Sequence, residues 1–166
     1  MAAGVGPASR PPTRMWIPRD SPGVYKALVA LQRVSSVGVD PEITELLAIR
    51  VSQLNSCAYG LHMHATDALD AHMEPRKLLM IAAWRDAGGL FSERERAALA
   101  LTEQLTLPGE NGVDDAVFAD AREYFDAGAI GQLVASIVMV NAWNRIAIAG
   151  GYPAGLDERR RSSAAR

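Results

Sequence analysis

The sequence predicts an all-α fold, a single domain of about seven helices that spans residues 21–153. Ser21-Pro22, Asp40-Pro41 and Glu74-Pro75 each place a proline at a first helical position, a typical start of a helix. After each start, apolar residues recur at spacings of three and four. No segment alternates apolar and polar residues with a period of two between hairpin turns, so strands are not expected.

The first four helices follow from these starts. The first helix ends at Gly38. Its expected buried stripe is Val24, Leu28, Leu31 and Val34. The second begins at Pro41 and reaches Leu54, where the capping residues Asn55 and Ser56 interrupt the apolar run. A third helix carries apolar residues from Leu61 to Leu69, and a fourth runs from Pro75 to the glycine pair Gly88-Gly89.

Three more helices follow. Ser92 and Glu95 form a capping box, in which each side chain binds the other's free backbone amide, and the fifth helix continues to Leu105. Residues 107–112 form a loop rich in Pro, Gly and Asn. The sixth helix holds Val117, Phe118, Ala121 and Phe125 and ends at Gly128. The seventh is long and apolar, from about residue 130 to residue 149.

Both ends of the chain differ in composition from the domain. Residues 1–20 are rich in Pro, Gly, Ala and Arg without periodicity, which predicts a flexible arm that Trp16 could anchor. Residues 154–166 contain three consecutive arginines, Arg159 to Arg161, among small polar residues. We expect this tail to be disordered.

Composition excludes several classes of function. The net charge of −2 gives no reason to expect nucleic acid or an anionic membrane as a partner. The longest apolar stretch, residues 133–140, is too short to span a membrane. A single cysteine, Cys57, rules out a disulfide within the chain and suits a reducing cytoplasm, where we expect the protein to be located.

The strongest candidate for chemistry is the segment around Cys57. On a helix, Cys57, Gly60 and His64 share one face, because they are three and four residues apart. With Asn55-Ser56 as the cap, Cys57 would lie in the first turn, where the helix dipole favours a thiolate. His64 could exchange a proton with that thiolate. Glu45 could reach the same place if the chain bends near Asn55.

Plainer interpretations remain open for each of these residues. A lone cysteine in a helical protein is usually an inert core residue, and His64 could be a core or interface histidine. Glu45 could be a solvated charge. A metal site made of His62, His64 and His72 is disfavoured, because side chains two apart on a helix diverge. Neither a metal nor another cofactor is expected.

Residues 50–64 read R-V-S-Q-L-N-S-C-A-Y-G-L-H-M-H, which resembles the R-x-S-Q-x-N-x-C-x-Y-C-x-x-x-H signature of alkylhydroperoxidase AhpD-like proteins. These proteins belong to the carboxymuconolactone decarboxylase superfamily. The resemblance continues in the motifs Ala83-Trp84-Arg85, residues 91–99 and residues 141–145, and covers most of residues 21–153.

The resemblance implies an all-helical homo-oligomer, from a dimer through a trimer to a hexamer. In active members a cysteine pair reduces hydroperoxides, while a glutamate and a histidine relay protons. Cys57 matches the first cysteine, which resolves the sulfenic acid, and His64 and Glu45 match the histidine and the glutamate. Gly60 stands where the second, attacking cysteine is expected.

Three functions are therefore open. The first is a thiol oxidoreductase of the peroxidase type, an antioxidant activity weakened or altered because it uses Cys57 alone and needs an external thiol reductant. The second is a non-catalytic oligomeric domain that binds a ligand or a partner. The third is acid–base chemistry on a small carboxylic acid by Glu45 and His64.

Overall fold

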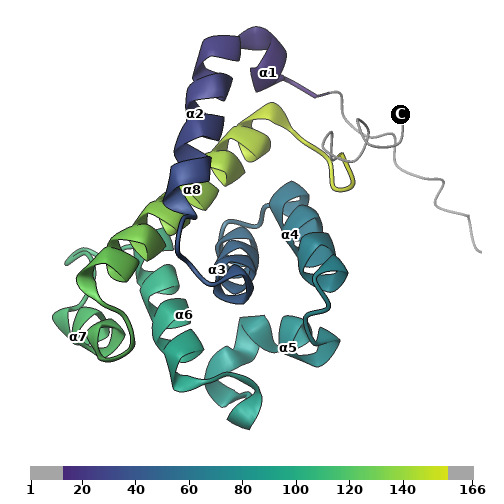
Figure 1. Ribbon diagram of the computed structural model, residues 1–166. Helices are drawn as coiled ribbons and strands as arrows, with labels where there is room; N and C mark the ends of the chain where they lie inside the picture. Colours follow the sequence, from purple (N-terminus) through teal and green to yellow (C-terminus); the bar gives the residue numbers. More distant parts are fainter. Residues whose placement is uncertain (1–12, 157–166) are drawn as a thin grey trace, which may run out of the picture.

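The computed structural model describes residues 13–156 as an all-α fold with eight α-helices and two 3₁₀ helices. The only β feature in this range is one isolated bridge between Gly109 and Gly112. Figure 1 shows the arrangement of the helices. The α-helices are α1 (Ile17–Asp20), α2 (Pro22–Ser35), α3 (Pro41–Leu54), α4 (Ala58–Asp70), α5 (Pro75–Met80), α6 (Glu93–Thr106), α7 (Asp115–Tyr124) and α8 (Ala127–Gly150).

Helix α3 is the centre of the fold and packs against α4, α6 and α8. It is buried on two faces, each of which belongs to a different apolar cluster. One face joins residues of α6, α7 and α8, and the other joins residues of α4, the 3₁₀ helix Ile81–Asp86 and α6. Because α3 is enclosed in this way, any polar side chain that it carries is placed firmly relative to its neighbours.

Helix α8 is the longest element, with 24 residues. Among the helices in residues 13–156, it alone is long and apolar enough to cross a membrane by length and composition. It packs, however, against α2, α3 and α6 and carries the buried polar residues Ser136, Asn141 and Asn144. We therefore interpret α8 as the core helix of the bundle.

The predicted burial of the apolar face of α2 is wrong. The expected buried stripe of this helix is largely exposed, because Val24, Leu31 and Val34 have relative exposures of 54%, 49% and 58%. Figure 1 shows α2 lying along α8 on one side of the molecule. The spacing of three and four correctly places these apolar residues on one face of α2, but nothing in the described chain covers that face.

The helix count also differs from the predicted number of about seven. Helix α1, which lies inside the predicted flexible arm, accounts for the additional α-helix. It is held by the N–H of Ile17, which donates to the Tyr152 hydroxyl at 2.9 Å, and by the ring contact between Trp16 and Tyr152. The predictions for residues 1–12 and 157–166 lie outside the described residues.

Most predicted helix starts are confirmed, while some ends are not. The Asp40 side chain caps α3, and Ser92 and Glu95 form the predicted capping box of α6. The predicted fourth helix, in contrast, stops at Met80 and continues as the 3₁₀ helix Ile81–Asp86. The backbone at Ala83 departs from helical angles, which interrupts the regular ladder of hydrogen bonds there.

Candidate functional site

The junction between α3 and α4 brings the candidate residues together. Helix α3 ends at Leu54 with Asn55 as its C-cap, and Ser56 adopts a left-handed conformation with a φ of 54°, which reverses the chain within two residues. This is the bend near Asn55 on which the approach of Glu45 depends. The side-chain Nδ2 of Asn55 donates to Asn141 Oδ1 at 2.9 Å, which ties the junction to α8.

Cys57 is the N-cap of α4, rather than a residue of its first turn as predicted from an Asn55-Ser56 cap. Its Sγ accepts a hydrogen bond from the N–H of Gly60 at 3.4 Å. The residue is only 2% exposed. Burial raises the pKa of the Cys57 thiol, although the backbone hydrogen bonds from Gly60 and Tyr59 act in the opposite direction. The expectation of a thiolate favoured at rest is therefore wrong.

Gly60 lies one turn after Cys57 and is itself buried. A Cβ atom placed on Gly60 would lie 2.7 Å from Ser52 Oγ, 3.0 Å from Asn144 Nδ2 and 3.5 Å from Cys57 Sγ. The first of these distances is too short for a real contact, so Ser52 would have to move. The place that a side chain at residue 60 would take is thus occupied by a hydroxyl and an amide.

Asn144 contributes an acceptor to this place that has no partner. Its amide nitrogen donates to Ser52 Oγ at 3.3 Å and to the carbonyl of Val140 at 3.0 Å. Its Oδ1 atom is buried and receives no hydrogen bond, and the residue is 2% exposed. A buried carbonyl oxygen without a donor costs about 1–3 kcal/mol, which makes it a preferred place for a hydroxyl group of a water or a substrate.

Glu45 and His64 meet across the two helices. Glu45 Oε2 lies 3.0 Å from His64 Nδ1, and the two side chains are 22% and 17% exposed. The separation is that of a hydrogen bond, so the carboxylate orients the imidazole ring and leaves its other nitrogen available for proton transfer.

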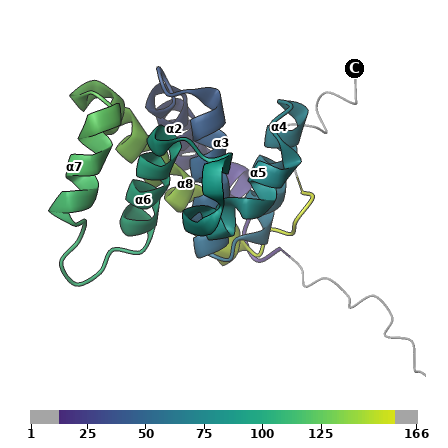
Figure 2. The same ribbon diagram turned by 90° about the horizontal axis from the view of Figure 1, so that it is seen from below.

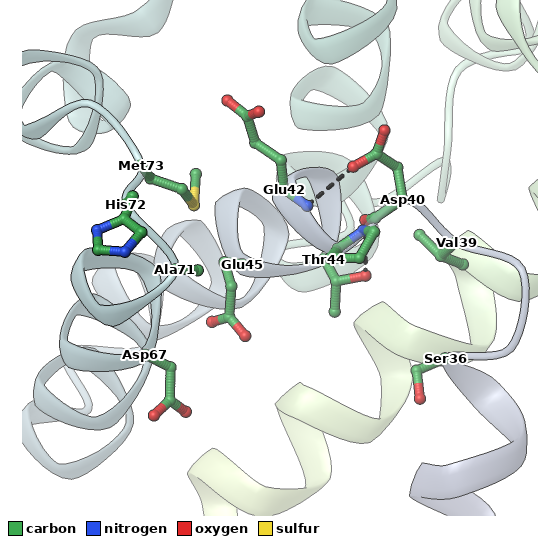
Figure 3. Close-up of a pocket in the computed structure, with 11 residues that line it drawn as sticks. Ser36, Val39, Asp40, Glu42, Thr44, Glu45, Asp67, Ala71, His72 and Met73 are labelled. Atoms are coloured by element: carbon green, nitrogen blue, oxygen red, sulfur yellow. Dashed lines mark hydrogen bonds between the residues drawn. The ribbon is translucent and has the colours of Figure 1, made fainter.

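A cavity of about 540 Å³ opens beside this pair. Figure 3 shows side chains from the start of α3 and from the second half of α4 facing it. Its lining includes four carboxylates, those of Asp40, Glu42, Glu45 and Asp67. Neither His64 nor Cys57 belongs to the lining, so the cavity reaches the Glu45 carboxylate of the pair but not the thiol.

Arg50, Trp84 and Arg85, which belong to the family-like motifs of the sequence, have a structural role instead. Glu103 on α6 accepts hydrogen bonds from Arg50, Trp84 and Arg85. Burial opposes the charge on Glu103, but these donors outweigh it and hold the pKa of the carboxyl below its usual value. The network ties α3, the 3₁₀ helix Ile81–Asp86 and α6 together, and Figure 2 shows these elements from below.

Sequence reasoning missed three residues of the site, which are Ser52, Asp67 and Asn144. Ser52 lies in the motif of residues 50–64 and Asn144 in that of residues 141–145, but nothing in their spacing indicates that they meet at Gly60. Asp67 follows His64 by three residues, so that the two share a face of α4. That spacing could have identified Asp67.

Known proteins resemble this chain in both sequence and fold. Residues 22–104 match the carboxymuconolactone decarboxylase family. The uncharacterized protein YdfG of Bacillus subtilis is 38% identical over 107 residues, which cover 64% of this chain and 72% of YdfG. A protein of unknown function from Agrobacterium tumefaciens, described as a candidate AhpD antioxidant defence protein, has a TM-score of 0.82 and 27% identity, with 87% of this chain and 99% of that chain covered.

A third relative shows the fold alone. An uncharacterized peroxidase-related protein with an AhpD core, from Ralstonia eutropha, has a TM-score of 0.70 at 20% identity. The match covers 81% of this chain and 73% of that chain.

Proposed function

This chain belongs to the carboxymuconolactone decarboxylase family, and on that premise we propose that it is a thiol oxidoreductase that reduces hydroperoxides with Cys57 alone. One observation carries the proposal: the Glu45–His64 pair is held at 3.0 Å by the two helices whose junction bears Cys57. The antioxidant-defence description of one structural neighbour and the peroxidase-related description of another agree with this chemistry.

The raised pKa of Cys57 makes an assisting base necessary. Only a thiolate attacks a peroxide at a useful rate, and a buried neutral thiol must first lose its proton. Cys57 and His64 are seven residues apart, which corresponds to about 10 Å along the helix. The proton therefore passes through water or through the substrate. The polar groups of Ser52 and Asn144 lie beside Gly60, which is about one helical turn from Cys57 and one turn from His64.

The reaction balances with two equivalents of an external thiol. The Cys57 thiolate attacks the terminal oxygen of the hydroperoxide, the O–O bond breaks, and the leaving alkoxide takes a proton from the Glu45–His64 pair to become an alcohol. Cys57 is then a sulfenic acid. A first external thiol converts it to a mixed disulfide and releases water, and a second restores the Cys57 thiol as an external disulfide forms.

Because Gly60 brings no second thiol, resolution inside the chain is not available, and we expect turnover to be slow. Cys57 is the only cysteine of the chain. The unpartnered Asn144 Oδ1 could accept a hydrogen bond from the O–H of the hydroperoxide as it approaches.

Acid–base chemistry by Glu45 and His64 is the second candidate, since Glu45 lines the cavity and Cys57 does not. The substrate expected from sequence, a small carboxylic acid, fits the cavity poorly. The Glu45 carboxylate in its lining, whose contact is with the His64 ring, would repel an anion. A substrate for this chemistry would have to be neutral or cationic.

We also propose that the protein is a homo-oligomer, a dimer, trimer or hexamer in which another copy covers the apolar face of α2. The exposed Val24, Leu31 and Val34 support this, together with Val138 on α8, which is 54% exposed. Side chains of this kind normally lie in interfaces when they gather on one face.

The test is peroxide consumption by the full chain with an excess of a small-molecule thiol, compared with Cys57→Ser and Glu45→Gln. Consumption that Cys57→Ser abolishes and Glu45→Gln lowers by about 100-fold would support the proposal. Consumption that is unaffected by Cys57→Ser would refute it.

A further inference from the structure

Three side chains from α3 and α4 place their polar atoms close together. Glu45 on α3 and His64 and Asp67 on α4 each offer one nitrogen or oxygen atom, and these atoms all lie within 4.8 Å of one another. Figure 3 shows Glu45 and Asp67 facing the same space from the two helices. Since His64 and Asp67 are three apart, one face of α4 presents both.

The surroundings of Glu45 favour a cation in this cluster. Of the four carboxylates in the cavity lining, Glu42 is paired with Lys77, and Asp40 lies 3.7 Å from Arg94. Glu45, in contrast, has its ion-pair contact with the His64 ring and not with a lysine or an arginine. Both side chains are partly buried, where the attraction between a carboxylate and a cation is stronger than in open solvent.

The cluster offers the donor atoms of a three-ligand metal site. One imidazole nitrogen and two carboxylate oxygens suit Zn²⁺ and similar divalent ions, rather than Cu⁺, which prefers sulfur, or Ca²⁺, which prefers oxygen. The Glu45–His64 separation of 3.0 Å is close to the spacing of two ligands on one zinc ion. The cavity beside the cluster leaves a fourth position open to water or a small ligand.

We propose that Glu45, His64 and Asp67 bind a divalent transition metal ion of the Zn²⁺ type. This goes beyond the proposed thiol chemistry, since Cys57 is not a ligand and the site needs no peroxide. The two functions share Glu45 and His64, so an ion bound there would withdraw both from proton transfer. Peroxide reduction should then be inhibited by Zn²⁺.

The test is isothermal titration of the full chain with Zn²⁺ at neutral pH. We expect one ion per chain and a loss of affinity of at least about tenfold in Asp67→Asn, which removes one ligand and leaves the Glu45–His64 pair in place. Asp70→Asn is the matched control, because Asp70 is an exposed aspartate on the same helix and is not part of the cluster. It should bind as the parent does.

Two further measurements keep the proposal falsifiable. His64→Gln should also weaken binding, and Co²⁺ used as a spectroscopic probe should give the visible bands of nitrogen and oxygen ligands. A sulfur-to-cobalt charge-transfer band would place Cys57 on the metal and overturn the proposal, as would Zn²⁺ affinity that is absent or unchanged in Asp67→Asn. Because binding is measured without peroxide, a protein that binds Zn²⁺ but consumes no peroxide would refute only the proposed function.

Discussion

Glu103 and Glu45 are two partly buried carboxylates with different surroundings. Glu103 is 15% exposed and accepts hydrogen bonds from three donors on two other elements. Glu45 is 22% exposed, makes a hydrogen bond with one titratable ring, and lines a cavity. A carboxylate whose acceptor sites are filled by fixed donors stabilises the fold, whereas one that faces a titratable partner and open space can transfer protons or bind ligands.

The same contrast separates the regions around them. The Glu103 region joins α3, α6 and the 3₁₀ helix Ile81–Asp86 by charged hydrogen bonds. The region around Cys57 holds a buried neutral thiol, an acceptor on Asn144 without a donor, and a glycine in close contact with polar atoms. Changes in the first region should alter stability, and changes in the second should alter reactivity.

The largest effect on stability is expected for Glu103→Ala. It leaves Arg50 as a charge that is only 14% exposed, and it leaves the Trp84 N–H without its acceptor. We expect the free energy of unfolding to fall by about 3 kcal/mol or more. Urea denaturation measures this, and Glu45→Ala should lower stability by less than about 1 kcal/mol. Equal losses in the two variants would remove the distinction between the two carboxylates.

Glycine replacements test the packing around Cys57. In Gly60→Ala the new Cβ meets Ser52 Oγ at 2.7 Å, so we expect a net loss of about 1–2 kcal/mol despite the better helix propensity of alanine. Gly131→Ala, on α8, is the control, because no atom lies within 4 Å of its Cβ. It should stabilise the protein by up to about 1 kcal/mol. Gly60→Ala as stable as the control would indicate spare room.

Gly60→Cys extends this test to chemistry. We expect the dithiol variant to form an intramolecular disulfide with peroxide, because its Cβ would lie 3.5 Å from Cys57 Sγ. Ser52 stands in the way, so Ser52→Ala combined with Gly60→Cys should oxidise faster than Gly60→Cys alone. Mass spectrometry of the peroxide-treated proteins would detect the loss of two hydrogens. A double variant that folds and never forms the disulfide would contradict this geometry.

The pH dependence of stability should report the burial of Cys57. Because the native pKa is raised, the unfolded chain loses the thiol proton first as the pH increases. Stability is thus retained below the ordinary thiol pKa of about 8.5 and declines above it, until the native thiol also ionises. Cys57→Ala should decline less over this range. Alkylation of the parent should be slow at neutral pH, and rapid alkylation there would mean that the thiol is not buried.

The smallest effect on the stability of a single chain is expected for Leu31→Lys on α2. Leu31 is 49% exposed, so the lysine is tolerated by the chain itself but not by an interface with another copy. Light scattering should show dissociation of the oligomer. Leu79→Lys, at a leucine that is 80% exposed on α5, should leave the assembly intact. A parent that is already monomeric would refute the proposed oligomer.

Local signals predicted much of the fold. Proline at the first helical position and capping side chains depend on neighbouring residues only, and the starts at Asp40 and Ser92 are confirmed. The sequence also predicted that Glu45 could approach His64 if the chain bends near Asn55. The left-handed Ser56 meets that condition.

The sequence could not predict which helix faces pack against each other. Periodicity identified the shared face of Val24, Leu31 and Val34, but whether that face is covered depends on distant segments. The pKa of Cys57 was misjudged for the same reason, since its burial comes from packing between α3, α4 and α8 and not from its place on α4. The contact between Asn144 and Ser52 joins residues 92 positions apart.

The most direct test of the account is the rate at which Cys57 becomes a sulfenic acid in the presence of a hydroperoxide. Trapping with a dimedone reagent, followed by peptide mass spectrometry, measures that rate without any reductant. We predict a Cys57 adduct whose formation slows by about 100-fold in Glu45→Gln and is unchanged in Asp70→Asn. No adduct in the parent, or the same rate in Glu45→Gln, would contradict the assignment of Cys57 and the Glu45–His64 pair to one reaction.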